Sequence, residues 1–188
     1  RFSHFVMRHA RLVLLGSLAI LLVMGWPVRH LQIGPADARS LPAAAESRQV
    51  QDILASAFEL NELSPILVVV STRVPLTDPA SIAALHRLHE TLGALPGVTR
   101  ATGLLSLDPA LTLADYQMLY QHPEAFPPAQ AALEAYSRGD TTLLHVQYRP
   151  DPASAEARAL VERIRALPAD PAIREVVVGG FPAFHLDY

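Results

Sequence analysis

Two histidines three residues apart are the strongest sign of chemistry in this sequence. His86 and His89 would share one face of a helix, with Glu90 beside them, and imidazoles at that spacing can hold a metal ion. The order of residues differs from the H-E-x-x-H pattern of zinc proteases, and no third ligand follows at a motif spacing. We therefore interpret the pair as part of a solvated helix face, with an anchored metalloenzyme as the alternative.

The other residues that catalysis would need form no recognisable constellation. The chain has no cysteine, which excludes thiolate nucleophiles, thiolate metal sites and disulfides. It has no G-x-S-x-G, P-loop or G-x-G-x-x-G motif, and Phe181-Pro182 follows Gly179-Gly180 where a phosphate-binding helix would begin. Beyond residue 30, three further histidines are scattered along the chain: His122, His145 and His185. We expect no catalytic, cofactor-binding or metal-binding residue and no enzymatic activity.

Charge is distributed unevenly along the chain. Residues 1–30 carry four arginines and no acid, whereas residues 31–188 carry eleven arginines and all eighteen acids. The 188 residues are 51% hydrophobic and 18% charged. The charged fraction lies below the roughly 25% of soluble domains, so disorder is excluded and contact with membrane lipid is expected. The acidic balance after residue 30 argues against a nucleic-acid partner, which would require a basic face.

An uncharged apolar run follows the basic N-terminal residues. It extends from Leu12 to Val28, which corresponds to about 25 Å of helix and the short end of a membrane span. The arginines that precede it predict a cytoplasmic N-terminus, with the chain after about residue 31 outside the cytoplasm. The alternative is a secretory signal peptide cleaved at Ala43 to Ala45, although that site lies well beyond the apolar run.

Strand and helix patterns alternate after a connector at residues 31–42. An amphipathic helix is predicted at 43–60, and strands are predicted at 65–71, 98–105, 142–148 and 175–179. Two more helices begin at Asp78-Pro79 and Asp151-Pro152, because Asp can cap free backbone amides and Pro fits the first turn. Residues 106–140 read as an insertion with helices at 111–120 and 128–136.

An internal repeat organises these elements. DPAS at 78–81 recurs at 151–154, and ALP at 94–96 recurs at 166–168. Each copy lies between two strand patterns, so the domain is expected to consist of two β-α-β units. Such units combine most simply into a ferredoxin-like βαββαβ sandwich. The predicted fold is therefore α+β.

This interpretation divides the chain into four segments. Residues 1–30 are expected to form a cytoplasmic lead-in and a transmembrane helix, 31–42 a connector, 43–180 an exported ferredoxin-like domain with a helical insertion, and 181–188 the start of a lead into another transmembrane helix.

The order of parts resembles the RND superfamily, specifically its MMPL-type transporters. The motifs that carry the resemblance are VMRH (6–9), DARSLP (37–42), ESR (46–48), LVVV (67–70), DPASIAAL (78–85), LPGV (95–98) and VVVGG (176–180). They cover essentially the whole chain, and the resemblance rests on their order.

The resemblance implies a fragment of a proton-driven transporter built from two similar halves. In that family a transmembrane helix leads into an exported porter domain with ferredoxin-like subdomains, and proton-coupling acids lie in later helices. It implies export of lipids or other hydrophobic molecules from the bacterial inner (cytoplasmic) membrane, with membrane lipid, the rest of the transporter and its second porter domain as partners. No functional residue is carried over, because this chain holds no acid within its apolar run.

The alternative function is that of an exported ligand-sensing domain of a membrane receptor. A receptor would bind a small molecule without moving it, and one span or a signalling module would come after Tyr188. A transporter fragment would instead be succeeded by several apolar spans.

Overall fold

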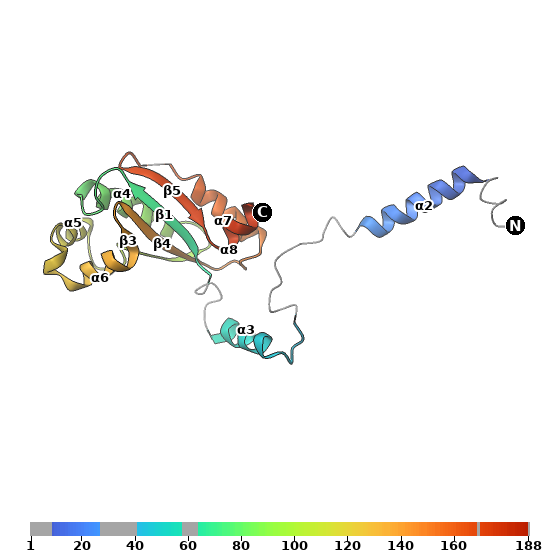
Figure 1. The fold of residues 1–188 in the computed structure, drawn as a ribbon, viewed down its shortest axis with the longest axis horizontal. Helices are drawn as coiled ribbons and strands as arrows, with labels where there is room; N and C mark the ends of the chain where they lie inside the picture. The colour runs from blue at the N-terminus through green and yellow to red at the C-terminus, as the bar shows by residue number, and fades with distance from the viewer. Residues whose placement is uncertain (1–8, 27–40, 58–63, 169, 188) are drawn as a thin grey trace. The chain divides into compact units, whose positions relative to one another are not determined.

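The computed structural model describes residues 9–26, 41–57, 64–168 and 170–187, and the chain divides into two compact units, residues 1–37 and 38–188 (Figure 1). In the first unit, helix α2 (Ala10–Gly25) exposes apolar side chains all round and buries none. The predicted run is thus helical as far as Gly25, and the rest of it beyond Trp26 lies outside the described residues. No helix in the described ranges is both long and apolar enough to cross a membrane.

The second unit opens with helix α3 (Glu46–Ala57), which is shorter than the predicted 43–60. Its first turn holds Glu46, and an ion pair joins Arg48 Nε to Asp52 Oδ1 at 2.9 Å one turn apart. The predicted residues 58–60 lie outside the described ranges.

A five-stranded antiparallel sheet is the centre of the second unit. Its strands are β1 (Ile66–Thr72), β2 (Val98–Thr102), the two-residue β3 (Ser137–Arg138), β4 (Thr141–Tyr148) and β5 (Ile173–Gly179). The strand order is β2-β4-β1-β5, β3 pairs with β4 outside this path, and every pairing is antiparallel. The predicted α+β class is confirmed.

The two repeats interleave within this sheet. Helix α4 (Pro79–Gly93) connects β1 to β2, and helix α7 (Ala155–Arg165) connects β4 to β5. Strand β4 lies between the two strands of the first repeat. Strand β1 lies between β4 and β5, the strands of the second repeat (Figure 1). Because neighbours are antiparallel, the two strands of one repeat are parallel to each other. Each repeat therefore contributes one strand that lies between the two strands of the other repeat.

One face of the sheet carries the core. Ile66, Val68 and Val70 of β1 are fully buried, and the register places Val146 and Leu144 beside the first two. Both repeat helices contribute to this same core: Ile82, Leu85 and Leu92 from α4, and Leu160, Val161 and Ile164 from α7. The alternation of buried and less buried residues in β1 and β4 shows that one face of the sheet is buried, and the shared core places α4 and α7 on that face.

The two DPAS segments begin their helices differently. Asp78 caps α4 as predicted, because its Oδ1 accepts a hydrogen bond from Ala80 N at 2.8 Å. The prediction that Asp151-Pro152 directly opens the second helix is wrong, since α7 starts at Ala155. There the Ser154 hydroxyl accepts from the Ala157 amide at 3.1 Å and supplies the cap.

The serine of the first copy is not available for that task. Ser81 is fully buried and its hydroxyl donates to the carbonyl of Val74 at 3.2 Å. The aspartate makes the same local bond in both copies, since Asp151 Oδ1 accepts from Ala153 N at 3.0 Å. The two helix starts therefore differ in the role of the serine.

The predicted insertion contains two α-helices, α5 (Leu113–Gln121) and α6 (Pro127–Tyr136), with a short 3-10 helix η3 (Pro123–Ala125) between them. Buried tyrosines of α5 attach the insertion to the segment after β2. Tyr116 donates to the Leu105 carbonyl at 2.9 Å, and Tyr120 donates to the Leu104 carbonyl. These carbonyls are engaged by side chains, and β2 ends at Thr102 instead of the predicted residue 105.

Residues after the last strand form a short helix, α8 (Phe181–Asp187), where only a lead toward a later segment was expected. The chain enters it through Gly180, whose φ of +99° favours glycine. A Cβ built on Gly180 would lie 2.7 Å from the Pro65 carbonyl oxygen, so the backbone passes β1 at a distance that excludes a side chain.

We predict that Gly180→Ala lowers the free energy of unfolding by about 2 kcal/mol or more, because it adds backbone strain to a steric clash. Gly179→Ala is the matched control, since its Cβ would meet nothing within 4 Å. Urea denaturation of both variants measures the difference. Equal stability of the two would contradict the close approach at Gly180.

Candidate functional site

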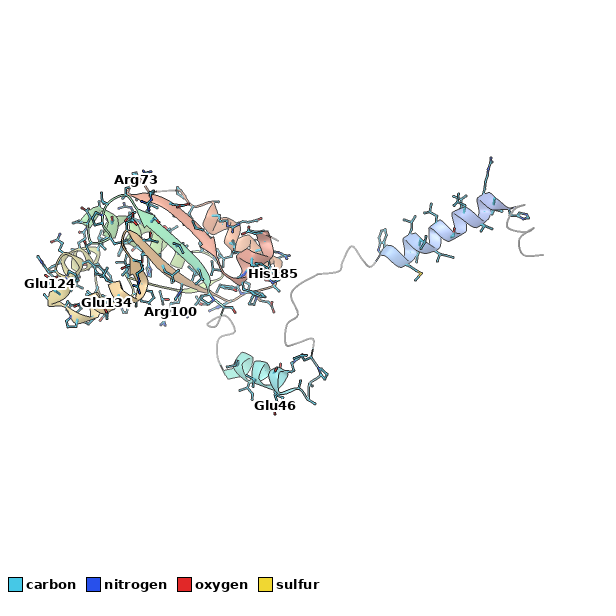
Figure 2. The ribbon with its side chains drawn as sticks, viewed as in Figure 1. Glu46, Arg73, Arg100, Glu124, Glu134 and His185 are labelled. Carbon is cyan, nitrogen blue, oxygen red and sulfur yellow. The ribbon has the colours of Figure 1, made fainter. Side chains whose placement is uncertain are left out.

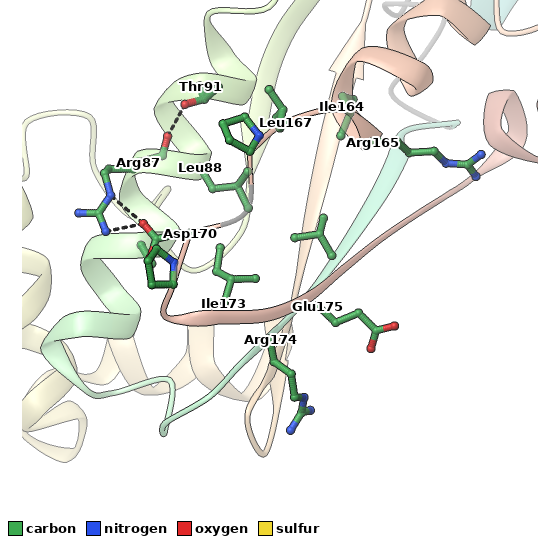
Figure 3. A pocket seen from close by; sticks show the side chains of 14 residues that line it. Arg87, Leu88, Thr91, Ile164, Arg165, Leu167, Asp170, Ile173, Arg174 and Glu175 are labelled. Atoms are coloured by element: carbon green, nitrogen blue, oxygen red, sulfur yellow. Dashed lines mark hydrogen bonds and ion pairs between the residues drawn. The ribbon is translucent and has the colours of Figure 1, made fainter.

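A groove with a volume of about 540 Å³ lies on the helix-covered side of the sheet. It lies among α4, the end of α7, the segment that leads to β5, and β5 itself (Figure 3). Its apolar lining consists of Ala84, Leu88, Ile164, Leu167, Pro168, Pro171, Ile173 and Val176. This volume is in the range of pockets that hold small molecules.

An ion pair between α4 and the segment before β5 lies on the rim of the groove. Arg87 Nη2 is 2.6 Å and Nε is 3.0 Å from Asp170 Oδ2 (Figure 3). The other carboxylate oxygen of Asp170 accepts from the Ala172 amide at 3.0 Å. The Ala172 amide, followed by the Arg87 guanidinium, lowers the pKa of Asp170 below its usual value. Asp170 is thus held in its charged form.

Two further arginines line the groove, and each has a carboxylate partner. Arg165 binds Asp187 of α8 with both terminal nitrogens, at 2.6 and 2.7 Å, and also donates to the Val178 carbonyl at 3.1 Å. Arg174 Nη1 lies 2.8 Å from Asp140 Oδ2. The arginines of the rim are therefore neutralised, and the arrangement suits an apolar, uncharged molecule better than a free anion.

The predicted histidine pair lies on α4, outside this groove. His86 Nδ1 is 3.4 Å from Glu90 Oε2, and its ring lies 6.5 Å from that of Tyr116. His89 is half-buried, and its Nδ1 has no hydrogen-bond partner. Burial, and then the neighbouring His86, lowers the pKa of His89, which favours the neutral imidazole. The solvated-face interpretation therefore fits Glu90 but not His89.

The other three histidines of the second unit lie apart from one another. His122 is exposed beside Glu124, His145 on β4 contacts the Tyr136 ring edge-on at 6.0 Å, and His185 on α8 lies 4.4 Å from the Phe181 ring (Figure 2). Across the described part of the chain, no group of three or more histidine or acidic residues could hold a metal ion.

The groove and its ion pair have no counterpart in the sequence interpretation. Arg87 and Asp170 are 83 positions apart, and nothing local connects them. The repeated DPAS and ALP motifs predicted the helices and strands around the groove but not which of their side chains meet. The sequence argues against a phosphate-binding helix start after Gly179-Gly180; a short helix, α8, nevertheless begins at Phe181, and Gly180 provides the turn into it.

No protein-family model matches the chain, and no curated protein matches it significantly.

We predict that Asp170→Asn destabilises the domain by less than about 1 kcal/mol at pH 7, because solvent screens the charge of Arg87, whose side chain is 59% exposed, while that of Asp170 is 18% exposed. The folded-state pKa of Asp170 is lowered, so its contribution is present above the unfolded pKa of about 3.9 and disappears as the pH falls through the folded value. The stability difference between the two proteins should shrink accordingly in urea denaturation at pH 7, 5 and 3. Glu175→Gln is the control, because it removes a carboxylate from the rim and keeps the Arg87–Asp170 pair. A stability difference between the original protein and Asp170→Asn that grows on acidification would contradict the lowered pKa of Asp170.

We predict that zinc does not change the melting temperature of the chain, because the described residues hold no group of three metal ligands. A bound ion would raise the melting temperature, since it would stabilise the folded state by mass action. His86→Ala is the comparison, since it removes one imidazole of the pair. A zinc-dependent rise in melting temperature that is lost in this variant would support the metalloenzyme alternative.

Proposed function

We propose that this chain is part of a proton-driven, MMPL-type transporter of the RND superfamily, to which it contributes a membrane anchor and an exported porter domain. Its cargo is then a lipid or another hydrophobic molecule. Its partners are membrane lipid, the remainder of the transporter and a second porter domain. In this proposal the protein belongs to a bacterial inner membrane, with the chain after about residue 31 on the periplasmic side.

The observation that carries the proposal is the interleaved sheet of two repeats. The order β2-β4-β1-β5, with α4 and α7 on one face, is the order that a ferredoxin-like βαββαβ domain would have. We assign the domain to that fold, with α5, η3 and α6 as the helical insertion between its halves. A porter domain with this fold is what the motif order of the sequence implies.

The apolar N-terminal helix supports the membrane part of the proposal. Among the large side chains of α2, Leu12 is 68% exposed and Val23 is 73% exposed, and no acidic residue accompanies them. A helix that is apolar all round needs an apolar environment, which a bilayer supplies. The anchor then comprises the uncharged run from Leu12 to Val28, with Arg11 and Arg29 at its ends.

The groove favours a second candidate function, that of a ligand-sensing domain of a membrane receptor. A cavity of about 540 Å³ with an apolar lining can bind a small molecule without any transport step. The same groove fits an exporter of hydrophobic molecules. The two functions predict different sequences for the part of the gene beyond Tyr188.

We predict that the gene continues after Tyr188 into several apolar spans of about twenty residues, at least one of which holds an Asp or Glu. Several helices are needed because a polar path through a bilayer must be enclosed by protein. Sequencing the gene beyond this point provides the check. A single span leading into a signalling module would favour the receptor and end the transporter proposal.

We predict that alkaline phosphatase fused after Gly180 is active in bacteria, because the arginines before α2 hold the N-terminus in the cytoplasm. A fusion that lacks residues 1–30 is the control and should be inactive, since nothing then directs export. If a reporter that is active only in the cytoplasm works when fused at the same position, the orientation is the opposite of the one proposed.

A further inference from the structure

The face of the sheet opposite α4 and α7 is apolar at its centre. Val69 of β1 pairs with Leu143 on one side and with Val177 on the other, so the three side chains form a row across β4, β1 and β5. Val69 is 36% exposed and Val177 is 51% exposed. Leu67 precedes this row on β1. We call these four residues the open-face row.

A hollow adjoins the open-face row. It has a volume of about 320 Å³, and its walls include Val69, Leu143 and Tyr136, the last residue of α6. An antiparallel sheet whose second face meets water normally alternates apolar and polar residues. The apolar residues on both faces of β1 and β5 therefore indicate that something covers the open-face row.

Helix α3 carries an exposed apolar stripe. Val50 is 55% exposed and Ile53 is 62% exposed, and Leu54 follows at helical spacing. The Arg48–Asp52 ion pair lies on the opposite side of the helix, because each of its members is about half a turn away from Val50. The stripe is thus separated from the charges of α3.

Two further properties of α3 indicate that its apolar stripe packs against the protein and not against a lipid surface. Its charged residues are Glu46, Arg48 and Asp52, whereas helices that lie on lipid surfaces are rich in Lys and Arg on their polar face. With twelve residues, α3 is also at the limit of what is stable alone in water, so its stability depends on tertiary contacts.

The connection to β1 keeps α3 close to the sheet. Eight residues, 58–65, separate Ala57 from Ile66 and span at most about 29 Å. Val69 lies only three residues further along β1, or about 10 Å. A tether of this length holds the stripe at a high effective concentration near the open-face row.

We propose that α3 packs its Val50, Ile53 and Leu54 stripe on the open-face row of the sheet. The sheet then has helices on both faces, and its apolar residues are covered by a segment of the same chain. This inference does not rest on the transport proposal, because it follows from exposure, charge and chain length within residues 41–188. In a transporter, it makes α3 the link between the sheet and the chain that follows α2.

The chain contains no cysteine, so pairs of cysteines can be introduced and cross-linked specifically. Val50→Cys is combined with Val177→Cys in the full chain, held in detergent micelles, and treated with a short bismaleimide. Asp52→Cys combined with Val177→Cys is the matched control, because it has nearly the same tether length but lies on the charged side of α3. We expect the intramolecular cross-link to form about tenfold faster with Cys at position 50 than at position 52, because docking raises the effective concentration of one side only.

Equal rates for the two pairs would overturn the proposal, since they would indicate a free tether. Cross-links between two chains would also overturn it and would assign the open-face row to a second copy.

Hydrogen exchange supplies a readout that needs no cross-linking. Val177→Asp places a charge in the open-face row and should remove protection from the amides of α3 while leaving those of α7 unchanged. Val74→Asp is the control, because Val74 is comparably exposed at 40% but lies after β1. Unchanged protection of α3 in Val177→Asp, or protection that depends on added lipid vesicles, would overturn the proposal in favour of a lipid surface.

Discussion

Burial of one face of β1 is the constraint on which the rest of the domain depends. Ile66, Val68 and Val70 are completely inaccessible to solvent, and β1 pairs with β4 on one side and with β5 on the other. Burying side chains of this size contributes about 1.5–3 kcal/mol each. Because β1 belongs to the first repeat and both of its neighbours to the second, neither repeat can form this core alone.

The cavity and the charged residues around it result from that arrangement. With α4 and α7 on one face, the segment between α7 and β5 returns past α4, and Arg87 meets Asp170 there. Arg165 likewise joins α7 to α8 through Asp187. These pairs contribute little stability, but they neutralise the three arginines that line the groove. The groove therefore combines an apolar lining with arginines that are paired to carboxylates.

Local patterns predicted most elements because their causes are local. Alternating side chains in Thr141–Tyr148, the cap at Asp78 and the tyrosine-bearing helices of the insertion all appear in the structure. The second DPAS helix was misplaced because Ser154 caps it, whereas its counterpart Ser81 is buried by packing. Helix α8 was not predicted, since its seven residues depend on the turn at Gly180 and on contacts with α7.

The sequence by itself determined that the apolar run from Leu12 begins as a helix, and it determined the two-repeat organisation and the α+β class, because charge, period and capping act over a few residues. Tertiary structure decided the interleaving of the repeats, the partners of Arg87 and Arg165, and which face of β1 is covered by α4 and α7. The physical reason is distance along the chain. Strand pairing and ion pairs join residues that are tens of positions apart, and no local pattern selects one such partner over another.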